Sequence, residues 1–547
     1  MAGLATTLGS GAMTNSIDDI VDAEVLLVVG SNTTEAHPVI ALRMKAAVRR
    51  HGARLILIDP RAVELADFAE LHLRPRPGTD VAVLNALAHV ILAEGLANRG
   101  FIEARTEGIE ALEAAVAAWT PERAEAVSGV PAGFIRQAAR IYASARQAAI
   151  FWAMGVTQHV SGTDNVKALS NLALLCGHLG RRGTGLNPLR GQNNVQGACD
   201  MGGLPNVFPG YQAVSSDEAR QKFAAGWGIP LERLSATPGL TVTEVMDAAL
   251  EGSVRGLYIL GENPMLSDPN LNHARQALAA LDFLVVQDIF LNETAALADV
   301  ILPGVSFAEK SGTFTNTERR VQMVRPVVSP PGESRQDWRI LQEVAAKLGA
   351  RWELHGPAEV FDEMARLTPS YAGMSHRRLE DGGLQWPCPT PDHPGTPILH
   401  VERFTRGRGL FVAVDYQPPA EEPDAAYPFI LSTGRMLFHW HGGTLSRRSP
   451  GLEALAPAAE VEIQPDDAAT LGVTDGDLVE VRSRRGEVRA RARLTERSPR
   501  GTVFMTFHFA EAAANLLTID AVDPVAKIPE FKVAAVSVRK VAEPAPA

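Results

Sequence analysis

The segment from Arg190 to Gly202, RGQNNVQGACDMG, concentrates residue types that bind ligands rather than build a core. It holds four side-chain amides, and each amide offers donors and acceptors that suit heterocycle edges and phosphate oxygens. Its glycines let the backbone approach a ligand closely. Arg190 offers a planar guanidinium fork that matches the two oxygens of a carboxylate or a phosphate. A polar surface loop is the alternative, but the density of such residues favours a binding site.

The first sixty residues predict a βαβ unit that could carry a nucleotide-like ligand. Apolar strands are expected over 23–30 and 54–58, with a helix over 39–50 between them. Ligands of such sheets lie beyond the carboxyl ends of the strands. We therefore expect these residues at a binding edge: Gly30, Asn32, His37, Asp59 and Arg61. The unit lacks the Gly-x-Gly-x-x-Gly fingerprint, and a simple turn explains Asp59-Pro60 equally well.

A second unit of the same layout is predicted further along the chain. It has strands over 256–261, 283–288 and 300–302 and a helix over 271–281. The separation between strand-end glycine and strand-end aspartate is 29 residues in the first unit and 27 in the second. Two such units suggest two nucleotide-like moieties or one two-headed cofactor.

Beyond residue 428 the pattern changes to short alternating strands, which predicts a β-barrel. The stretches 204–240 and 355–423 are rich in proline and glycine, and we expect them to be irregular. The predicted class is α/β, with two Rossmann-like doubly wound domains related by an approximate repeat and a C-terminal β-barrel. The expected domains are 1–192, 193–305, 306–424 (a connecting region with one helix) and 425–547.

Composition limits the classes of protein to which this chain can belong. The chain has 547 residues, a formal net charge of −11 and 46% hydrophobic residues, which is typical of a globular protein and argues against a nucleic-acid binder. No apolar run is long enough to cross a bilayer, and no signal peptide is recognised. The three cysteines are too far apart for a cluster motif and are typical of a reducing compartment, so we expect a cytoplasmic location without membrane insertion.

An ordered set of motifs carries a family resemblance. GSNTTEAHP, IDPR, GVTQ, GENP, VVQDIF, ADVILP, GTFTNTERR and IPEF occur in an order that resembles the molybdopterin oxidoreductases that bind a bis-guanine-dinucleotide cofactor. The opening segment, together with STGRMLFHWHGGTLSRRS and FHFAEAAANLLT, looks like the catalytic subunit of a formate dehydrogenase of the NAD-linked cytoplasmic type. The resemblance covers essentially the whole chain.

The resemblance implies a role for each matching residue. Arg190 would be catalytic and would orient formate at the metal, and the pterin would lie against Gly191 and Gln192. One guanine dinucleotide would contact Gly30, Asn32, His37, Asp59, Pro60, Arg61, Gly78, Asp80, Met154 and Gln158. The other would contact Gly261, Glu262, Asn263, Gln287, Asp288 and Asp337. The barrel would close over pterins and phosphates with Arg435, His439, His508, Asn515 and Lys532.

The chain also departs from the family pattern. The family places cysteine motifs for a 4Fe-4S cluster, and then a Cys or selenocysteine that ligates molybdenum or tungsten, just before a segment that here starts at Ala2. We therefore expect a truncated subunit whose metal ligand lies upstream of Met1, or on a separate N-terminal chain, and which has no ligands for the cluster.

The intact family would oxidise formate to CO2 and pass two electrons through iron–sulfur and flavin partner subunits to NAD. The sequence does not distinguish molybdenum from tungsten. Two other functions stay open: a non-catalytic module that binds the molybdopterin cofactor, and another oxidoreductase of the superfamily that acts on nitrate or arsenite.

Overall fold

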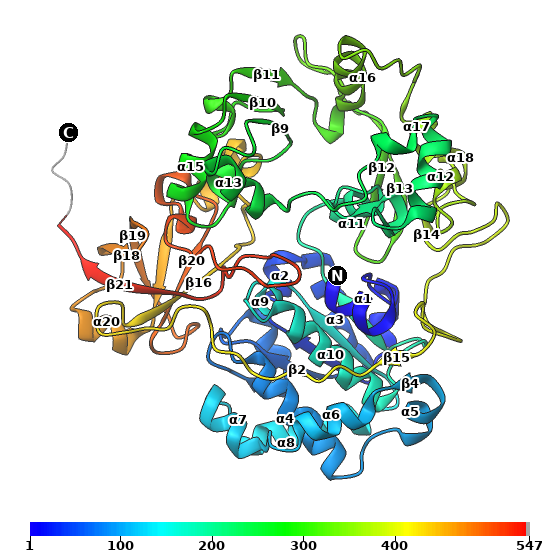
Figure 1. Cartoon of the computed structure of the whole chain (residues 1–547). Coiled ribbons are helices and arrows are strands. Elements are labelled where there is room, and N and C mark those ends of the chain that lie inside the picture. The colour runs from blue at the N-terminus through cyan, green and yellow to red at the C-terminus, as the bar shows by residue number, and fades with distance from the viewer. Residues whose placement is uncertain (543–547) are drawn as a thin grey trace. The chain divides into compact units, whose positions relative to one another are not determined.

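The computed structural model describes residues 1–542, which form two compact units. Unit 1 comprises Met1–Gly191, Pro269–Asn272 and Ile398–Ala547, and unit 2 comprises Gln192–Asp268 and His273–Pro397. Figure 1 traces the chain from its blue N-terminal part through green to the red C-terminal strand. Each unit is described by itself.

Unit 1 contains a five-stranded parallel sheet of order β3-β2-β1-β5-β6. Its strands are β1 (Val25–Val29), β2 (Arg54–Ile58), β3 (Leu71–Leu73), β5 (Ala148–Trp152) and β6 (Gly185–Pro188). The strand order runs outward in opposite directions from β1, so the crevice between β1 and β5 is the topological switch point where such sheets bind ligands.

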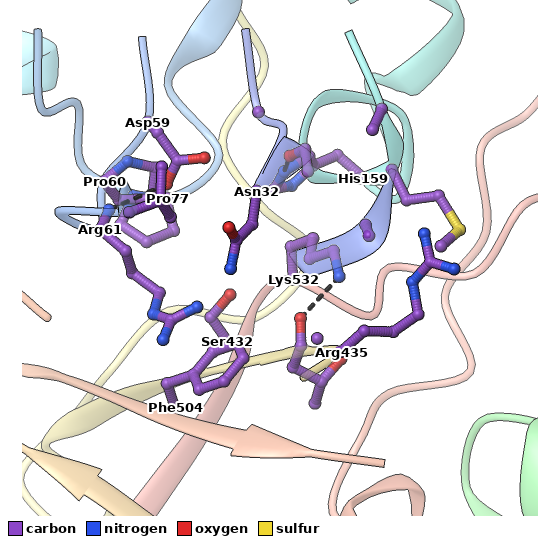
Figure 2. A pocket seen from close by; sticks show the side chains of 18 of the residues that line it. Asn32, Asp59, Pro60, Arg61, Pro77, His159, Ser432, Arg435, Phe504 and Lys532 are labelled. Atoms are coloured by element: carbon purple, nitrogen blue, oxygen red, sulfur yellow. Dashed lines mark hydrogen bonds between the residues drawn. The ribbon is translucent and has the colours of Figure 1, made fainter. Parts of the chain in front are cut away.

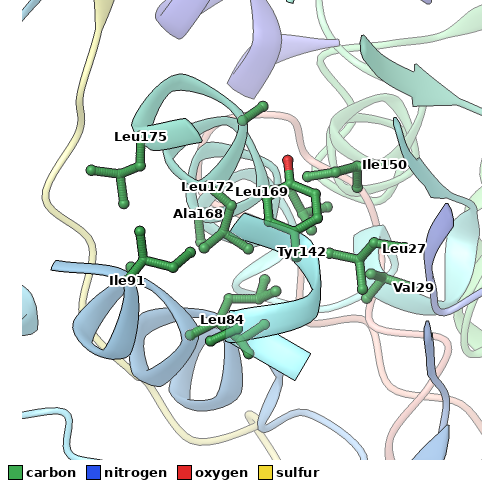
Figure 3. Close-up of a cluster of buried hydrophobic side chains, with 14 of the residues drawn as sticks. Leu27, Val29, Leu84, Ile91, Tyr142, Ile150, Ala168, Leu169, Leu172 and Leu175 are labelled. Atoms are coloured by element: carbon green, nitrogen blue, oxygen red, sulfur yellow. The ribbon is translucent and has the colours of Figure 1, made fainter. Parts of the chain in front are cut away.

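The strands of this sheet are buried on both faces. Leu27 and Val29 pack with helices on one face, where Figure 3 shows them near Leu84, Tyr142 and Leu169. Alternate residues of the same strands, such as Val28, pack against helix α3 on the other face. The covering helices are α3 (Pro38–His51), α4 (Asp80–Ala93), α8 (Ala132–Ser144) and α10 (Gly162–Cys176). This double coverage explains the continuous apolar runs of the strands.

The other regular elements of the N-terminal part are short. They are α1 (Ala2–Leu8), α2 (Thr33–Ala36), α5 (Arg99–Arg105), α6 (Ile109–Val116), α7 (Pro121–Ser128) and α9 (Met154–Thr157), with β4 (Thr106–Glu107) pairing in parallel with β15 (Gly409–Leu410).

A closed barrel completes unit 1, with the order β16-β20-β17-β19-β18-β21. Its strands are β16 (Phe429–Gly434), β17 (Glu460–Ile463), β18 (Leu478–Arg482), β19 (Glu487–Leu494), β20 (Thr502–Thr506) and β21 (Ala534–Lys540), and its helices are α19 (Pro450–Leu455) and α20 (Pro465–Leu471). Alternation along β19 puts Val488, Ala490 and Ala492 in the barrel core and the intervening charged residues outside.

Unit 2 is built around a three-stranded parallel sheet, β11-β10-β9, and an antiparallel sheet, β12-β13-β14. Its strands are β7 (Val207–Phe208), β8 (Gln212–Ala213), β9 (Gly256–Leu260), β10 (Phe283–Asp288), β11 (Val300–Pro303), β12 (Gly312–Thr315), β13 (Arg320–Val324) and β14 (Leu384–Gln385). Its helices are α11 (Val195–Asp200), α12 (Asp217–Trp227), α13 (Val242–Leu250), α14 (Pro264–Ser267), α15 (Leu271–Ala279), α16 (Asp337–Lys347), α17 (Pro357–Leu367) and α18 (His376–Leu379).

The α/β class, the parallel sheets and the C-terminal barrel predicted from the sequence are confirmed. The stretches expected to be irregular are more ordered than predicted. Helix α12 lies within 204–240, and α17 lies within 355–423, where it buries Phe361 and Met364. Within residues 1–542, none of the helices combines the length and the apolar character that a bilayer crossing requires.

Candidate functional site

A pocket in unit 1 opens at the switch point of the five-stranded sheet. Its walls come from the carboxyl ends of β1, β2 and β5 and from the barrel, as Figure 2 shows. Gly30 follows β1 with a positive φ of 55°, and a β carbon there would lie 2.6 Å from the backbone nitrogen of Val156. The close crossing of these two backbones requires glycine, and it shapes the floor of the pocket.

Asp59 is one of three acidic residues that line this pocket, with Glu35 and Asp80. It follows β2, is buried, and accepts a hydrogen bond from the backbone N–H of Arg61 at 2.9 Å. Burial raises the pKa of Asp59 to about 6, although the Arg61 hydrogen bond and charge oppose the shift. The side chain is therefore an ionised acceptor at neutral pH and becomes a neutral acid only slightly below it.

Arg61 joins the sheet to the barrel. Its guanidinium forms an ion pair with Glu462 at 2.7 Å and lies over the ring of Phe504, 3.4 Å from the centroid. Its Nε is buried and has no hydrogen-bond partner among residues 1–542. The head group is thus held rigidly at the pocket wall with one donor left for a ligand.

Two further cations reach the pocket from the barrel. Lys532, 8% exposed, donates from Nζ to the carbonyl of Thr433 at 2.6 Å (Figure 2). Desolvation, and then the charge of Arg435, lower the pKa of Lys532 to about 7. Desolvation also lowers the pKa of Arg435, to about 10. The pocket lining thus combines four basic side chains, those of Arg61, Arg76, Arg435 and Lys532, with the carboxylates of Glu35, Asp59 and Asp80. The basic side chains suit an anionic ligand.

Unsatisfied amide atoms lie beside these charges. Both side-chain polar atoms of Asn32 are buried and have no hydrogen-bond partner within residues 1–542, and the same holds for Oε1 of Gln158. Buried polar atoms are rarely left without partners in folded proteins, so these amides point to a polar ligand. Gln158 lies outside the pocket lining, so the open amide of the pocket is that of Asn32. Together with the basic side chains and the carboxylates it forms a set of donors and acceptors that suits a nucleotide diphosphate.

The structure brings most, but not all, of the first set of predicted residues together. In the described chain the pocket is lined by Gly30, Asn32, Asp59, Pro60, Arg61, Asp80, Met154, Arg435 and Lys532. The lining does not include His37, Gly78, Gln158, Gly191, His439, His508 or Asn515, all of which are in unit 1. Their role in cofactor binding stays a prediction.

The histidines predicted on the barrel make protein contacts. His439 is buried and its Nε2 lies 2.7 Å from the carbonyl of Ala456. His508 accepts from the backbone N–H of Met436 at 3.2 Å and donates from Nδ1 to the carbonyl of His441. Burial lowers the pKa of His508 to about 3, which is consistent with one donor and one acceptor nitrogen.

Arg190 lies at the end of unit 1. Its Nη2 donates to the carbonyl of Gly11 at 3.0 Å, and its own carbonyl accepts from Nε2 of His37 at 2.6 Å. Gln192 begins unit 2. The two halves of the opening segment thus belong to different units.

The second half of that segment is internally anchored. Asp200 is buried and accepts hydrogen bonds from Gln196, Tyr211, Tyr371 and Trp386. Asn194 adopts a positive φ of 60°, and its side-chain oxygen accepts from the backbone of Thr315. Two of the four amides that the sequence offered as ligand groups therefore hold the local fold.

The second set of predicted residues gathers at the carboxyl ends of β9 and β10 in unit 2. Gln287 donates to Asp337 at 2.9 Å and accepts from Tyr258 at 2.5 Å. The side-chain oxygen of Asn263 accepts from both the N–H and the hydroxyl of Thr294. The remaining members are Gly261 (φ 66°), Glu262 and Asp288.

Burial raises the pKa values of Glu262 and Asp288. Asp268, which the sequence interpretation did not select, is raised further, to about 7, by burial and by the charge of Glu262. Carboxylates held in this way can accept from the N–H groups of a heterocycle, and ionisation is favoured when such donors bind.

Sequence interpretation also missed His159 and Phe504 in the unit 1 pocket. His159 is buried, 3.6 Å from Glu530 and 4.0 Å from Asp80. His159 directly follows Gln158, in the segment after strand β5. Its position after a strand could therefore have marked it as a candidate site residue. Phe504 sits within a barrel strand whose pattern gives no sign that one residue stacks on an arginine from the other domain.

Two family models match the chain: Molybdopterin oxidoreductase over residues 3–347, and Molydopterin dinucleotide binding domain over residues 429–535. The chain is 49% identical to the F420-dependent formate dehydrogenase subunit alpha of Methanocaldococcus jannaschii, covering 99% of this chain and 80% of that protein. It is 40% identical to formate dehydrogenase H of Escherichia coli, covering 99% and 76%.

Among solved structures, acetylene hydratase from Pelobacter acetylenicus superposes with a TM-score of 0.78 over 99% of this chain and 80% of that one, at 21% identity, which shows a common fold. A family model that spans most of the chain, close relatives over nearly its full length and a nucleotide-type pocket lead to one conclusion. The chain belongs to the molybdopterin oxidoreductase family.

Proposed function

We propose that this chain is the catalytic subunit of a formate dehydrogenase that holds molybdenum or tungsten in a bis-molybdopterin guanine dinucleotide. The observation that carries the proposal is the unit 1 pocket, whose basic side chains, buried carboxylates and open Asn32 amide suit a guanine nucleotide diphosphate. Several relatives at 40–50% identity are named formate dehydrogenases, which supports formate as the substrate.

Different residues of the chain would bind different parts of the cofactor. Asp59 would accept from the N1 and N2 donors of one guanine, while Arg61, Arg435 and Lys532 would neutralise phosphates. The second dinucleotide would be held in unit 2 by Glu262, Asn263, Gln287, Asp288 and Asp337. When bound, the metal–pterin group supplies the two-electron redox chemistry, and the protein supplies orientation and electrostatics.

Arg190 would orient the substrate. A guanidinium presents parallel N–H groups that match the two oxygens of formate, and the Gly11 carbonyl restrains one of its nitrogens. Because the bound carboxylate is already oriented, less entropy is lost when the transition state is reached.

The electrons would pass to partner subunits that carry iron–sulfur or flavin groups. The names of three relatives specify F420, whereas the sequence interpretation expected NAD, so both acceptors belong in the assay.

The experiment is anaerobic purification of the chain with its co-purifying subunits, followed by metal analysis, release of GMP and formate-dependent viologen reduction. Arg190→Lys is expected to lower kcat/KM for formate at least about 100-fold, as the loss of a substrate-orienting group does, with GMP content unchanged. Arg182→Lys is the control, since that exposed arginine pairs with Asp22. GMP without formate turnover would indicate a binding module, and turnover of nitrate or arsenite instead would indicate another oxidoreductase; either result contradicts the proposal.

A further inference from the structure

The backbone around Arg190 is held at three successive residues. The N–H of Leu189 donates to the carbonyl of Trp152, the last residue of β5, at 2.8 Å. The Arg190 carbonyl accepts from His37 at 2.6 Å, and the Gly191 carbonyl accepts from Nη1 of Arg435 at 3.2 Å. These three contacts fix the main chain before and after the α carbon of Arg190.

His37 is suited to hold a carbonyl. Burial lowers its pKa to about 4, so the ring is neutral and Nε2–H can donate to the Arg190 carbonyl. Its backbone is itself fixed, since its N–H donates to Thr33 at 2.8 Å and Pro38 starts α3 immediately afterwards. The donor therefore projects from the rigid junction of α2 and α3.

Arg435 is held in turn by His441. Nη1 of Arg435 lies 3.3 Å from Nε2 of His441, whose carbonyl accepts from His508. Gly191 leaves little space on this side, since a β carbon there would lie 3.3 Å from Cε of Met154 and 3.4 Å from Cε1 of His441. Met154 and His441 thus enclose this side of the Gly191 backbone.

We propose that His37 and Arg435 form a carbonyl clamp that positions Arg190, with His441 orienting Arg435. The substrate role of Arg190 rests on the proposed function, whereas the clamp itself rests on the contacts above. His37 and Arg435 hold the carbonyls that follow the Arg190 α carbon, and the Leu189 N–H holds the chain before it. The side chain therefore extends from a fixed α carbon toward Gly11. His37, which the sequence interpretation assigned to the cofactor, is here a positioning residue.

The test compares His37→Leu, which removes the donor, with His37→Gln, which keeps an N–H donor. His89→Leu is the matched control, because Nδ1 of His89 lies 3.0 Å from the carbonyl of Val116, a histidine–carbonyl contact elsewhere in unit 1. Hydrogen exchange of the full chain is followed by mass spectrometry over peptides covering residues 187–195. We expect at least about tenfold faster exchange there in His37→Leu alone, near wild-type exchange in His37→Gln, and no change there in His89→Leu.

The second readout is kinetic and uses the cofactor-loaded enzyme. His37→Leu is expected to lower kcat/KM for formate about tenfold with GMP content unchanged, and to have little further effect in an Arg190→Lys background. Additive effects of the two substitutions, or exchange that rises equally throughout unit 1, would overturn the positioning role. Local exchange changes in a chain that fails to oxidise formate would support the clamp and reject the proposed function.

Discussion

Arg61 and Glu462 form an ion pair at 2.7 Å with side chains only 7% and 8% exposed, one from the loop after β2 and the other from barrel strand β17. The pair therefore fastens the sheet domain to the barrel across the rim of the pocket. Desolvated pairs of this kind differ from surface pairs in one measurable respect: the loss of one partner leaves an uncompensated charge in the interior.

Glu462→Gln is expected to lower the free energy of unfolding by about 3 kcal/mol, because Arg61 would stay buried without its counter-charge. Urea denaturation checks this value. Glu70→Gln is the control: its pair with Arg54 is similarly short but 40–47% exposed, so a loss below about 1 kcal/mol is expected. Equal losses of unfolding free energy in the two variants would show that burial does not increase the cost of breaking the Arg61 pair.

Lys532→Met is expected to change how stability depends on pH. The folded-state pKa of Lys532 is about 7, below its ordinary value of 10.5, so the unfolded chain binds more protons between these pH values. The stability contribution of this lysine is fully present above pH 10.5 and is lost as pH falls through about 7. The free energy of unfolding of Lys532→Met minus that of wild type, measured by denaturation of the cofactor-free chain, should therefore decrease from pH 7 to pH 9. A constant difference over this range contradicts the assigned cause.

Asp59→Asn is expected to weaken binding of guanosine diphosphate to the cofactor-free chain by about 10- to 100-fold, as the loss of a charge-assisted acceptor does. The pKa of Asp59 is raised to about 6, so wild-type affinity should fall as pH drops below that value while the variant stays flat. Titration calorimetry between pH 5 and pH 8 measures both effects. The exposed carboxylate Asp67 gives the control variant Asp67→Asn, and an unchanged affinity in Asp59→Asn would remove Asp59 from the site.

Gly30→Ala is expected to be more destabilising than Gly52→Ala. Both glycines have positive φ, 55° and 73°, but a β carbon at Gly52 meets nothing within 4 Å, whereas one at Gly30 would lie 2.6 Å from the Val156 nitrogen. The loss of unfolding free energy in Gly52→Ala therefore measures the backbone penalty alone, roughly 1 kcal/mol. The additional loss in Gly30→Ala measures the cost of displacing the α9 segment. Thermal unfolding of the two variants gives the comparison, and equal losses would argue against a tight crossing.

The sequence predicted most of the elements that carry the pocket, since buried parallel strands are continuous apolar runs and their positions set the ligand-binding edge. Residues 54–58 form β2 as expected, and Asp59 and Arg61 follow it into the pocket. Helix α17 was missed because its short amphipathic pattern lies between proline- and glycine-rich flanks.

Contacts between distant segments could not be inferred in the same way. Neither the stacking of Arg61 on Phe504 nor the bond between His37 and the Arg190 carbonyl leaves a local pattern, since each partner looks ordinary in its own stretch of sequence. His439 and His508 illustrate the same limit: their motif predicts ligand contacts, and the structure adds that their ring nitrogens bind main-chain atoms of the barrel domain, which no local pattern indicates.

The pocket takes its floor from segments near Gly30 and Gly155 and its opposite wall from Arg435 and Lys532. The floor is therefore synthesised well before Arg435 and Lys532, and the pocket is incomplete until the barrel strands have been made. Under the proposed function, the cofactor would bind only after that point, and the chain would first exist with an empty pocket. An assembly factor that protects this state would meet Arg435 and Lys532 at the pocket wall, since Arg61 is already paired with Glu462.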